Sequence, residues 1–171
     1  MKRKISLLLG IVLIALFSFF TFSTNTQADS LSYAEEHSAV QVTVPDPILV
    51  NKSGNNIVDN NIQLDSDWAA PQYGIDILGQ KYFQIASDEY ILADDVYPYV
   101  ATNEIIKVTT DVPARLYTYD GQLVKNCMLA PNTHWYSDRI MESQTADGNT
   151  YFLRVATNEF VKFSDTALVI N

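Results

Sequence analysis

Two stretches of this sequence, 70 residues apart, repeat the same pattern of side chains. Residues 82–95 read YFQIASDEYILADD, and residues 152–165 read FLRVATNEFVKFSD. Eight of the fourteen positions match in kind, from Tyr82 and Phe152 to Asp95 and Asp165, and Glu89 returns as Glu159. A repeat of this length predicts a duplicated module, because each copy has to keep the same buried positions.

The repeat also extends upstream, where the offset is 67 residues and Trp68 matches Trp135. Three additional residues in a turn-forming stretch before Phe152 account for the change of offset. The sequence therefore predicts two units, residues 40–99 and residues 106–171, with a short hinge at residues 100–104 between them.

Within each unit the pattern favours β-hairpins. Apolar and polar residues alternate, β-branched and aromatic residues are frequent, and Asp120-Gly121 is a typical hairpin turn. No long segment has the 3.6-residue period of an amphipathic helix. Five or so short strands in about 60 residues indicate a small barrel, since closure protects the sheet edges. We expect an all-β protein with two tandem small SH3-like β-barrel repeats.

The N-terminus has the order of a secretory signal peptide. Basic residues at positions 2–4 precede an apolar run from Ile5 to Phe22, and small residues lead up to Ala28. We expect residues 1–28 to be the signal peptide and residues 29–39 a tether. An uncleaved anchor is the alternative, because an 18-residue apolar run is close to the length of a membrane span. After cleavage the chain would be secreted and would have no membrane span.

The remaining residues, 29–171, are strongly acidic, with 20 Asp and Glu against 8 Lys and Arg. This charge excludes a general nucleic-acid-binding protein, which needs clustered cations for phosphate contacts. The single cysteine, Cys127, cannot form an internal disulfide. It is either a small buried apolar residue or a pairing site for another chain.

The charge is divided unequally between the two units. Residues 29–105 hold 13 acidic and 2 basic residues, whereas residues 106–171 hold 7 acidic and 6 basic residues. The second-unit cations are Lys107, Arg115, Lys125, Arg139, Arg154 and Lys162, and their aligned counterparts are Val40, Ile48, Val58, Gln72, Gln84 and Leu92. Each basic position of the second unit is therefore uncharged in the first.

The second unit carries an ordered set of motifs that resembles a known family. Ala114-Arg115-Leu116-Tyr117 and Asp120-Gly121 are followed by Trp135 and by the paired segments 151–155 and 159–162. This order resembles the SLAP domain, the cell-wall-attachment module of surface-layer protein A in Gram-positive lactic acid bacteria. The family usually carries the domain as a C-terminal tandem pair, in agreement with the two units here.

The resemblance implies a secreted, non-catalytic surface-layer-associated protein, held non-covalently at the cell wall by anionic polymers of the teichoic acid type. The candidate polymer-binding residues are Lys107, Arg115, Lys125, Arg139, Arg154, Lys162, Tyr119 and Tyr136. Arg and Lys suit phosphate groups, and tyrosine rings suit sugars. The same cations could instead only solvate a β-surface. As an alternative function, the acidic first unit would make the protein an adaptor that docks on basic surface-layer proteins.

Other chemistries have weaker signals. Cys127 and His134 have no third group to complete a catalytic set, so we expect no enzyme and no cofactor. The acidic pairs Asp65/Asp67, Asp88/Glu89 and Asp94/Asp95 lack the spacing of a calcium loop, so we expect no metal site and favour solvation of the surface. Trp135 is expected to fill the core, since Trp68 recurs in the unit with few cations.

Overall fold

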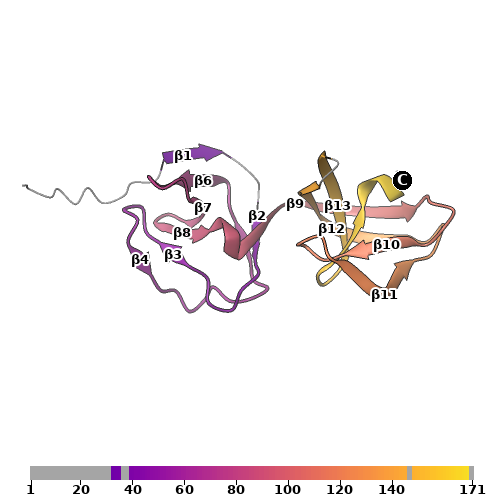
Figure 1. Ribbon diagram of the computed structural model, residues 1–171, viewed down its shortest axis with the longest axis horizontal. Coiled ribbons are helices and arrows are strands. Elements are labelled where there is room, and N and C mark those ends of the chain that lie inside the picture. Colours follow the sequence, from indigo (N-terminus) through magenta and orange to yellow (C-terminus); the bar gives the residue numbers. More distant parts are fainter. Residues whose placement is uncertain (1–31, 36–38, 146–147, 170–171) are drawn as a thin grey trace, which may run out of the picture.

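The computed structural model describes residues 32–35, 39–145 and 148–169, and within them the protein is almost entirely antiparallel β-sheet (Figure 1). The expected signal peptide lies outside the described residues. The prediction of an all-β protein is confirmed. Within the described residues, no helix is both long and apolar enough to cross a membrane.

The first half of the chain forms one sheet and contributes to a second. The six-stranded sheet has the order β1-β6-β7-β8-β3-β4. Its strands are β1 (Ser32–Glu35), β3 (Leu49–Val50), β4 (Asn56–Ile57), β6 (Gln72–Ile75), β7 (Lys81–Ala86) and β8 (Glu89–Leu92). Part of the segment expected to be a tether is therefore strand β1, which pairs with β6.

The second sheet has the order β11-β10-β14-β13-β12-β9-β2-β5, and β15 also pairs with β9. From the first half come β2 (Ala39–Val42) and β5 (Asp67–Ala69). From the second half come β10 (Ala114–Tyr117), β11 (Leu123–Leu129), β12 (His134–Thr145), β13 (Gly148–Ala156), β14 (Glu159–Lys162) and β15 (Thr166–Leu168). Short 3-10 helices, η1 (Ala93–Asp95) and η2 (Phe163–Asp165), precede β9 and β15.

Two expectations about architecture are corrected. The strand order of neither sheet returns to its first strand, so the sheets are open and not the closed barrels that the sequence predicts. The expected hinge at residues 100–104 lies inside one continuous strand, β9 (Val96–Val108). Its first half pairs with β2 and its second half with β12 and β15. The two parts of the chain therefore share a strand (Figure 1).

The aligned segments have matching local structure. Tyr82 pairs with Leu92 as Phe152 pairs with Lys162, and the register shifts at the same place in both hairpins. Matching hydrogen bonds also occur further upstream. The Val42 N–H donates to the Ser66 carbonyl at 2.9 Å, and the Val108 N–H donates to the Thr133 carbonyl at 3.0 Å.

This correspondence changes one alignment. The offset is 66 and not 67 in the first strand of each unit, because Val108 takes the place of Val42. The counterpart of Lys107 is therefore Gln41, not Val40.

The three largest apolar clusters among the described residues stabilise the protein. One lies in the first half around Val40, Phe83 and Ile91, and another lies in the second half around Ile106 and Leu116. The third lies where the halves meet, with Tyr97, Tyr99, Met141, Phe152 and Phe160 as its buried members. Because the third cluster takes residues from both halves, the halves pack against each other as well as sharing β9.

Candidate functional site

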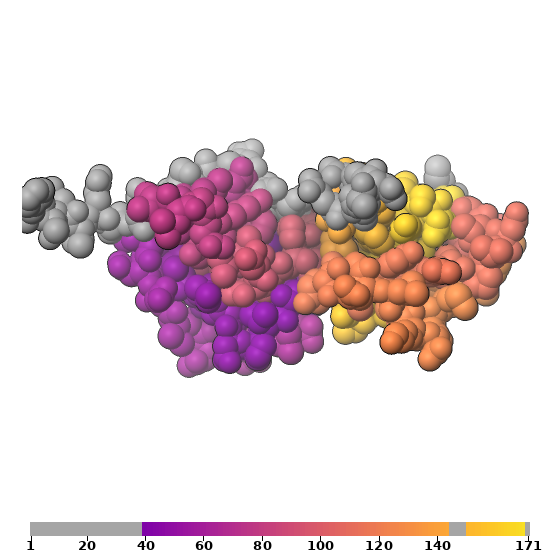
Figure 2. Space-filling model, in the orientation of Figure 1, coloured from indigo at the N-terminus to yellow at the C-terminus, as the bar shows by residue number. Residues whose placement is uncertain are grey.

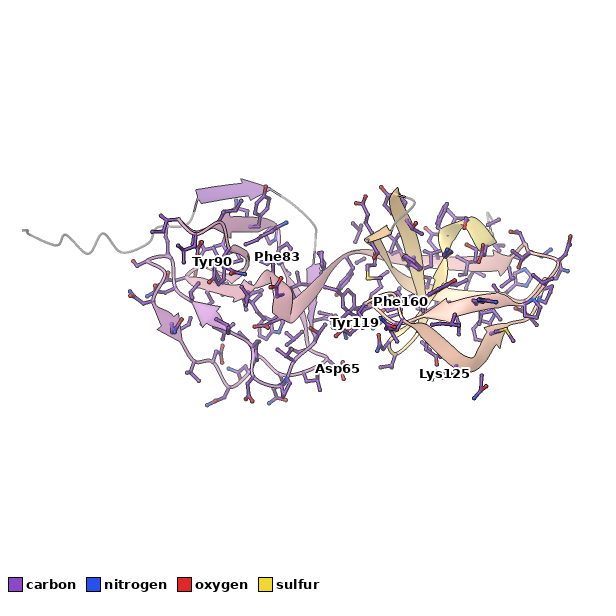
Figure 3. The ribbon with its side chains drawn as sticks, in the orientation of Figure 1. Asp65, Phe83, Tyr90, Tyr119, Lys125 and Phe160 are labelled. Atoms are coloured by element: carbon purple, nitrogen blue, oxygen red, sulfur yellow. The ribbon has the colours of Figure 1, made fainter. Side chains whose placement is uncertain are left out.

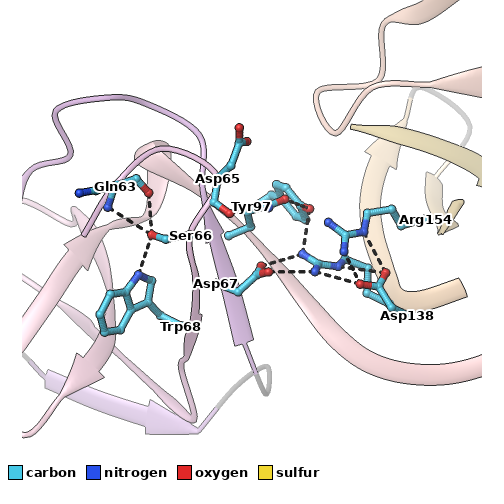
Figure 4. Close-up of polar contacts among 10 residues, drawn as sticks. Gln63, Asp65, Ser66, Asp67, Trp68, Tyr97, Asp138 and Arg154 are labelled. Atoms are coloured by element: carbon cyan, nitrogen blue, oxygen red, sulfur yellow. Dashed lines mark hydrogen bonds and ion pairs between the residues drawn. The ribbon is translucent and has the colours of Figure 1, made fainter. Parts of the chain in front are cut away.

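Arg139, on β12, is a buried cation that joins the two halves. Its side chain is only 4% exposed, and its two terminal nitrogens donate to the two oxygens of Asp67 at 2.8 and 3.1 Å (Figure 4). The guanidinium lies 4.0 Å from the ring centre of Tyr99 and donates to the Tyr97 hydroxyl at 3.2 Å. This bidentate geometry is the strong form of an arginine–carboxylate pair. The Arg139 guanidinium is therefore occupied by contacts within the molecule and is not open to an external ligand.

Arg154, on β13, belongs to the same network. Ile140 pairs with Leu153, so one step along the register places Arg139 opposite Arg154. Both arginines donate to Asp138, with Arg154 Nε at 2.8 Å and Arg139 Nη2 at 3.1 Å (Figure 4). One carboxylate thus neutralises two facing cations, which would otherwise repel each other. We call Asp67, Asp138, Arg139 and Arg154 the joint network.

The joint network shifts the pKa values of Asp138 and Arg139. Burial opposes ionisation of Asp138, but the hydrogen bonds from Arg154 and Arg139 outweigh it and hold the pKa of Asp138 below its ordinary value. Burial would lower the pKa of Arg139, but its bonds to Asp67 and Asp138 raise it. Burial raises the pKa of Tyr99 to about 12 in spite of the nearby Arg139. Asp138 and Arg139 are therefore both charged at neutral pH.

Tyr119 packs beside this network. Its ring stacks on Tyr97 with centres 5.4 Å apart, and Tyr97 meets Phe160 edge to face at 5.7 Å. Tyr119 and Phe160 lie close together at the boundary between the halves (Figure 3). The Tyr119 N–H also donates to the side chain of Asn158 at 2.9 Å. Tyr119 is thus half-buried between the halves.

Arg115 and Lys162 form a second pair of facing cations, and this pair is open to solvent. Leu116 pairs with Val161, so one step along the register places Arg115 on β10 opposite Lys162 on β14. Arg115 is exposed and Lys162 half-buried, with its ammonium 5.4 Å from the ring centre of Tyr117. Among the described residues, neither cation forms an ion pair with a carboxylate. We call Arg115 and Lys162 the outer cation pair, and Tyr117 is the tyrosine beside it.

The other three candidate residues are spread over the second half. Lys125 is exposed on β11, where it extends away from the ribbon (Figure 3). Lys107 is half-buried on β9, opposite His134 and Ala167. Tyr136 is 54% exposed on β12 and borders a hollow of about 200 Å³ together with Asp138 and Arg154. The eight candidates therefore do not form one surface.

The structure also shows where Trp135 and Cys127 lie. Trp68 packs against the first core, but Trp135 is 37% exposed, so its predicted core position is wrong. The two indoles nevertheless bond alike: Trp68 donates to Ser66 Oγ at 2.8 Å, as Figure 4 shows, and Trp135 donates to Thr133 Oγ1 at 2.7 Å. Cys127 is half-buried against the second core.

One member of each acidic pair of the first half forms a hydrogen bond or an ion pair within the chain. Asp88 accepts the Lys52 N–H and Asp95 accepts the Ile48 N–H, each at 2.7 Å, while Asp67 binds Arg139. In the part of the chain that the structure describes, no group of three potential metal ligands occurs.

Sequence reasoning missed the residues that complete the joint network. The sequence indicates no role for Asp138, Tyr97 or Tyr99, and it suggests Asp67 only as a weak metal ligand, although each contacts Arg139. A signal was present in the sequence. The paired residues Gln72 and Gln84 of the first unit both become arginine in the second. A simultaneous change at two facing positions, next to a new carboxylate, indicates an ion network and not two independent surface cations.

No protein-family model and no curated protein matches this chain. Among solved structures, the chain is similar to the crystal structure of a "putative autolysin" from Listeria monocytogenes. The sequence identity is 13% and the TM-score 0.38, over 84% of this chain and 67% of that chain. A similarity at this level does not establish a shared fold.

Proposed function

We propose that this is a secreted, non-catalytic protein that binds an anionic cell-wall polymer through the outer cation pair of its second half. The observation that carries the proposal is the position of Arg115 and Lys162 on neighbouring strands of an exposed surface. Like charges that face each other across a β-ladder are destabilising. A phosphate group bound between them would relieve the repulsion and accept hydrogen bonds from both.

The neighbouring side chains suit a polymer better than a free ion. Tyr117 lies under Lys162 and is half-buried, so part of its ring offers an apolar face to a sugar or glycerol unit. Met128 pairs with Arg115 on the other side and is 57% exposed. A repeating phosphate polymer of the teichoic acid type has both kinds of group along its length. The resemblance to SLAP domains supports the same ligand class.

The described part of the first half has no equivalent of this surface. The counterparts of Arg115 and Lys162 are Ile48 and Leu92, which are also neighbours, since the Leu92 N–H donates to the Ile48 carbonyl at 3.0 Å. Around them the first unit is strongly acidic. An anionic polymer would therefore be attracted to the second half and repelled by the first, and we infer that wall contact belongs to the second half alone.

The test is sedimentation of the purified protein with isolated Gram-positive cell walls, before and after extraction of teichoic acid. The proposal predicts that the protein sediments with intact walls, that salt weakens this binding, and that extraction abolishes it. Sedimentation that is unchanged after extraction would overturn the polymer as ligand.

A second candidate function is an adaptor on basic surface-layer proteins, and the charge of the first unit favours it. The same assay separates the two functions. An adaptor would sediment with walls only when surface-layer protein is still present on them. The polymer-binding protein would sediment with walls that have been stripped of all protein.

A further inference from the structure

Each half carries a hollow, and the two hollows overlap in part when the copies are aligned. The first, of about 290 Å³, is lined by Asp46, Pro47, Ile57, Val58 and Asp59, among others. The second, of about 360 Å³, lies along β10 and β11. Its lining includes Arg115, Leu123, Val124, Lys125 and Met128. At the offset of 67 residues, the segment 57–60 of the first lining corresponds to the segment 124–127 of the second.

The two linings are complementary in charge. The first hollow contains two carboxylates and no basic residue, whereas the second contains two cations and no acidic residue. Both also carry exposed apolar side chains. Val58 is 88% exposed in the first, and Leu123 and Met128 are 47% and 57% exposed in the second. Exposed aliphatic residues beside charges of one sign are typical of an interaction surface.

Lys125 is the side chain best placed to reach into another molecule. It is exposed on β11, an edge strand of its sheet, and it projects away from the ribbon (Figure 3). Its aliphatic stem can lie on Val58 and Pro47 while its ammonium meets the carboxylate of Asp46, because lysine buries its stem and keeps its charge at a polar site.

The two hollows cannot meet within one chain. Strand β4 borders the first and β11 borders the second, and they lie well apart along the long axis, with β9 between them (Figure 1). Figure 2 shows the two halves side by side along the same axis. A contact between the complementary hollows therefore requires two copies of the chain.

We propose that this protein self-associates head to tail, with the Lys125 edge of one copy docked on the Asp46 hollow of the next. The contact joins two different surfaces, so each copy keeps one of them open after pairing, and the assembly grows as an open chain and does not stop at a dimer. The contact is small and charged, so it is weak and salt lowers its affinity. The docked edge shares Arg115 with the outer cation pair, so the test uses Lys125, which lies in the hollow and outside that pair.

The experiment is sedimentation equilibrium of the full chain at low salt, from about 10 µM to about 1 mM, the range in which weak contacts form. The proposal predicts an average mass that rises with concentration beyond about twice that of the monomer. Lys125→Asp and Asp46→Lys should each abolish the rise, and the double variant should restore it. Asp46 is preferred over Asp59, which accepts the Asn61 N–H at 2.8 Å and shapes a turn.

Mixing the two single variants gives a sharper result. The Asp46→Lys copy can pair only with the Lys125→Asp copy, because contacts between like copies set charges of the same sign against each other. Contacts between unlike copies match opposite charges at both surfaces, so the mixture should recover the rise in average mass that neither variant shows alone. Asp94→Lys, at an exposed site outside the hollow, is the matched control and should behave as the unmodified protein. A protein that stays monomeric throughout, or a Lys125→Asp variant that associates normally, overturns the proposal.

Discussion

Arg139 and Asp67 lie 72 residues apart in the sequence, and their side chains form a two-pronged ion pair across the boundary between the two halves. The arginine is buried, and its guanidinium also contacts Tyr97 and Tyr99. Its charge is therefore part of the structure. The six second-half cations, which look alike in the sequence, accordingly fall into an internal pair, Arg139 and Arg154, and a set at the surface.

We predict that Arg139→Gln, which introduces the residue of the first unit, lowers the free energy of unfolding by about 3 kcal/mol. Removing one member of a buried ion pair leaves its partners unpaired, and such changes cost about 3–5 kcal/mol. Asp67 is partly exposed, so the lower end of this range applies. Urea unfolding followed by tyrosine fluorescence measures the change.

Arg115→Gln is the matched control for this prediction. Arg115 is exposed, and surface substitutions usually change stability by less than about 0.5 kcal/mol. Equal losses in the two variants would show that Arg139 does not have the structural role assigned to it.

We predict that stability falls on both sides of neutral pH. The pKa of Asp138 is lower in the folded protein than in the unfolded chain, so its contribution is complete above about pH 4 and is lost as the pH falls through the folded value. The pKa of Tyr99 is raised to about 12, so its contribution is complete below about pH 10 and is lost as the pH rises toward that value. Thermal unfolding from pH 2 to pH 11 tests this.

Asp138→Asn isolates the acidic part of this effect. Without the carboxylate, the fall in stability between about pH 5 and about pH 2 should become smaller. An unchanged acid profile in this variant would assign the effect to other carboxylates.

Asp138 and Arg154 should be energetically coupled. Asp138→Asn leaves two arginines facing each other, so it should be strongly destabilising alone and less so when Arg154 is already glutamine. For residues in one ion network the coupling is about 0.5–3 kcal/mol. A double-mutant cycle of unfolding free energies measures it, and additive effects would contradict the shared carboxylate.

The sequence contains enough to predict the all-β fold and the positions of the second-half hairpins. The alternating pattern and the Asp120-Gly121 turn are local signals, which can be read without knowing the tertiary contacts. The open sheets and the continuous strand β9 could not be predicted in this way. Residues 100–104 have no marked apolar alternation, and they become a strand because β12 supplies the hydrogen-bonding partner.

The candidate site residues also differ in how far the sequence alone predicts their positions. Charge alone is enough to predict that Arg115 and Lys125 are exposed, since no carboxylate of the described residues forms an ion pair with them. The sequence does not reveal the carboxylates that bind Arg139 and Arg154, so both arginines are predicted at the surface. Asp67 is distant in the sequence, and Asp138 is adjacent to Arg139 only. The sequence alone does not place Lys162 opposite Arg115, because that position depends on the pairing of β10 with β14.

Lys162→Leu, which restores the residue of the first unit, should leave the stability unchanged or raise it by up to about 1 kcal/mol in the absence of polymer. The change removes a repulsion between facing cations, and cross-strand pairs contribute about 0.2–1 kcal/mol. Thermal unfolding at low salt is the measurement. A clear loss of stability would mean that Lys162 has a structural partner.

The most direct test of the proposed function compares two variants that each introduce first-unit residues. Arg115→Ile combined with Lys162→Leu removes the outer cation pair, whereas Arg154→Gln removes a cation of the joint network. The affinity of each folded variant for isolated, protein-free cell walls is measured by sedimentation at low salt. Each charge-assisted hydrogen bond contributes about 1.5–3 kcal/mol, so the first variant should bind at least about tenfold more weakly. Arg154→Gln should bind as the unmodified protein does. Unchanged binding in the first variant, or a loss confined to Arg154→Gln, would contradict the assignment of wall contact to Arg115 and Lys162.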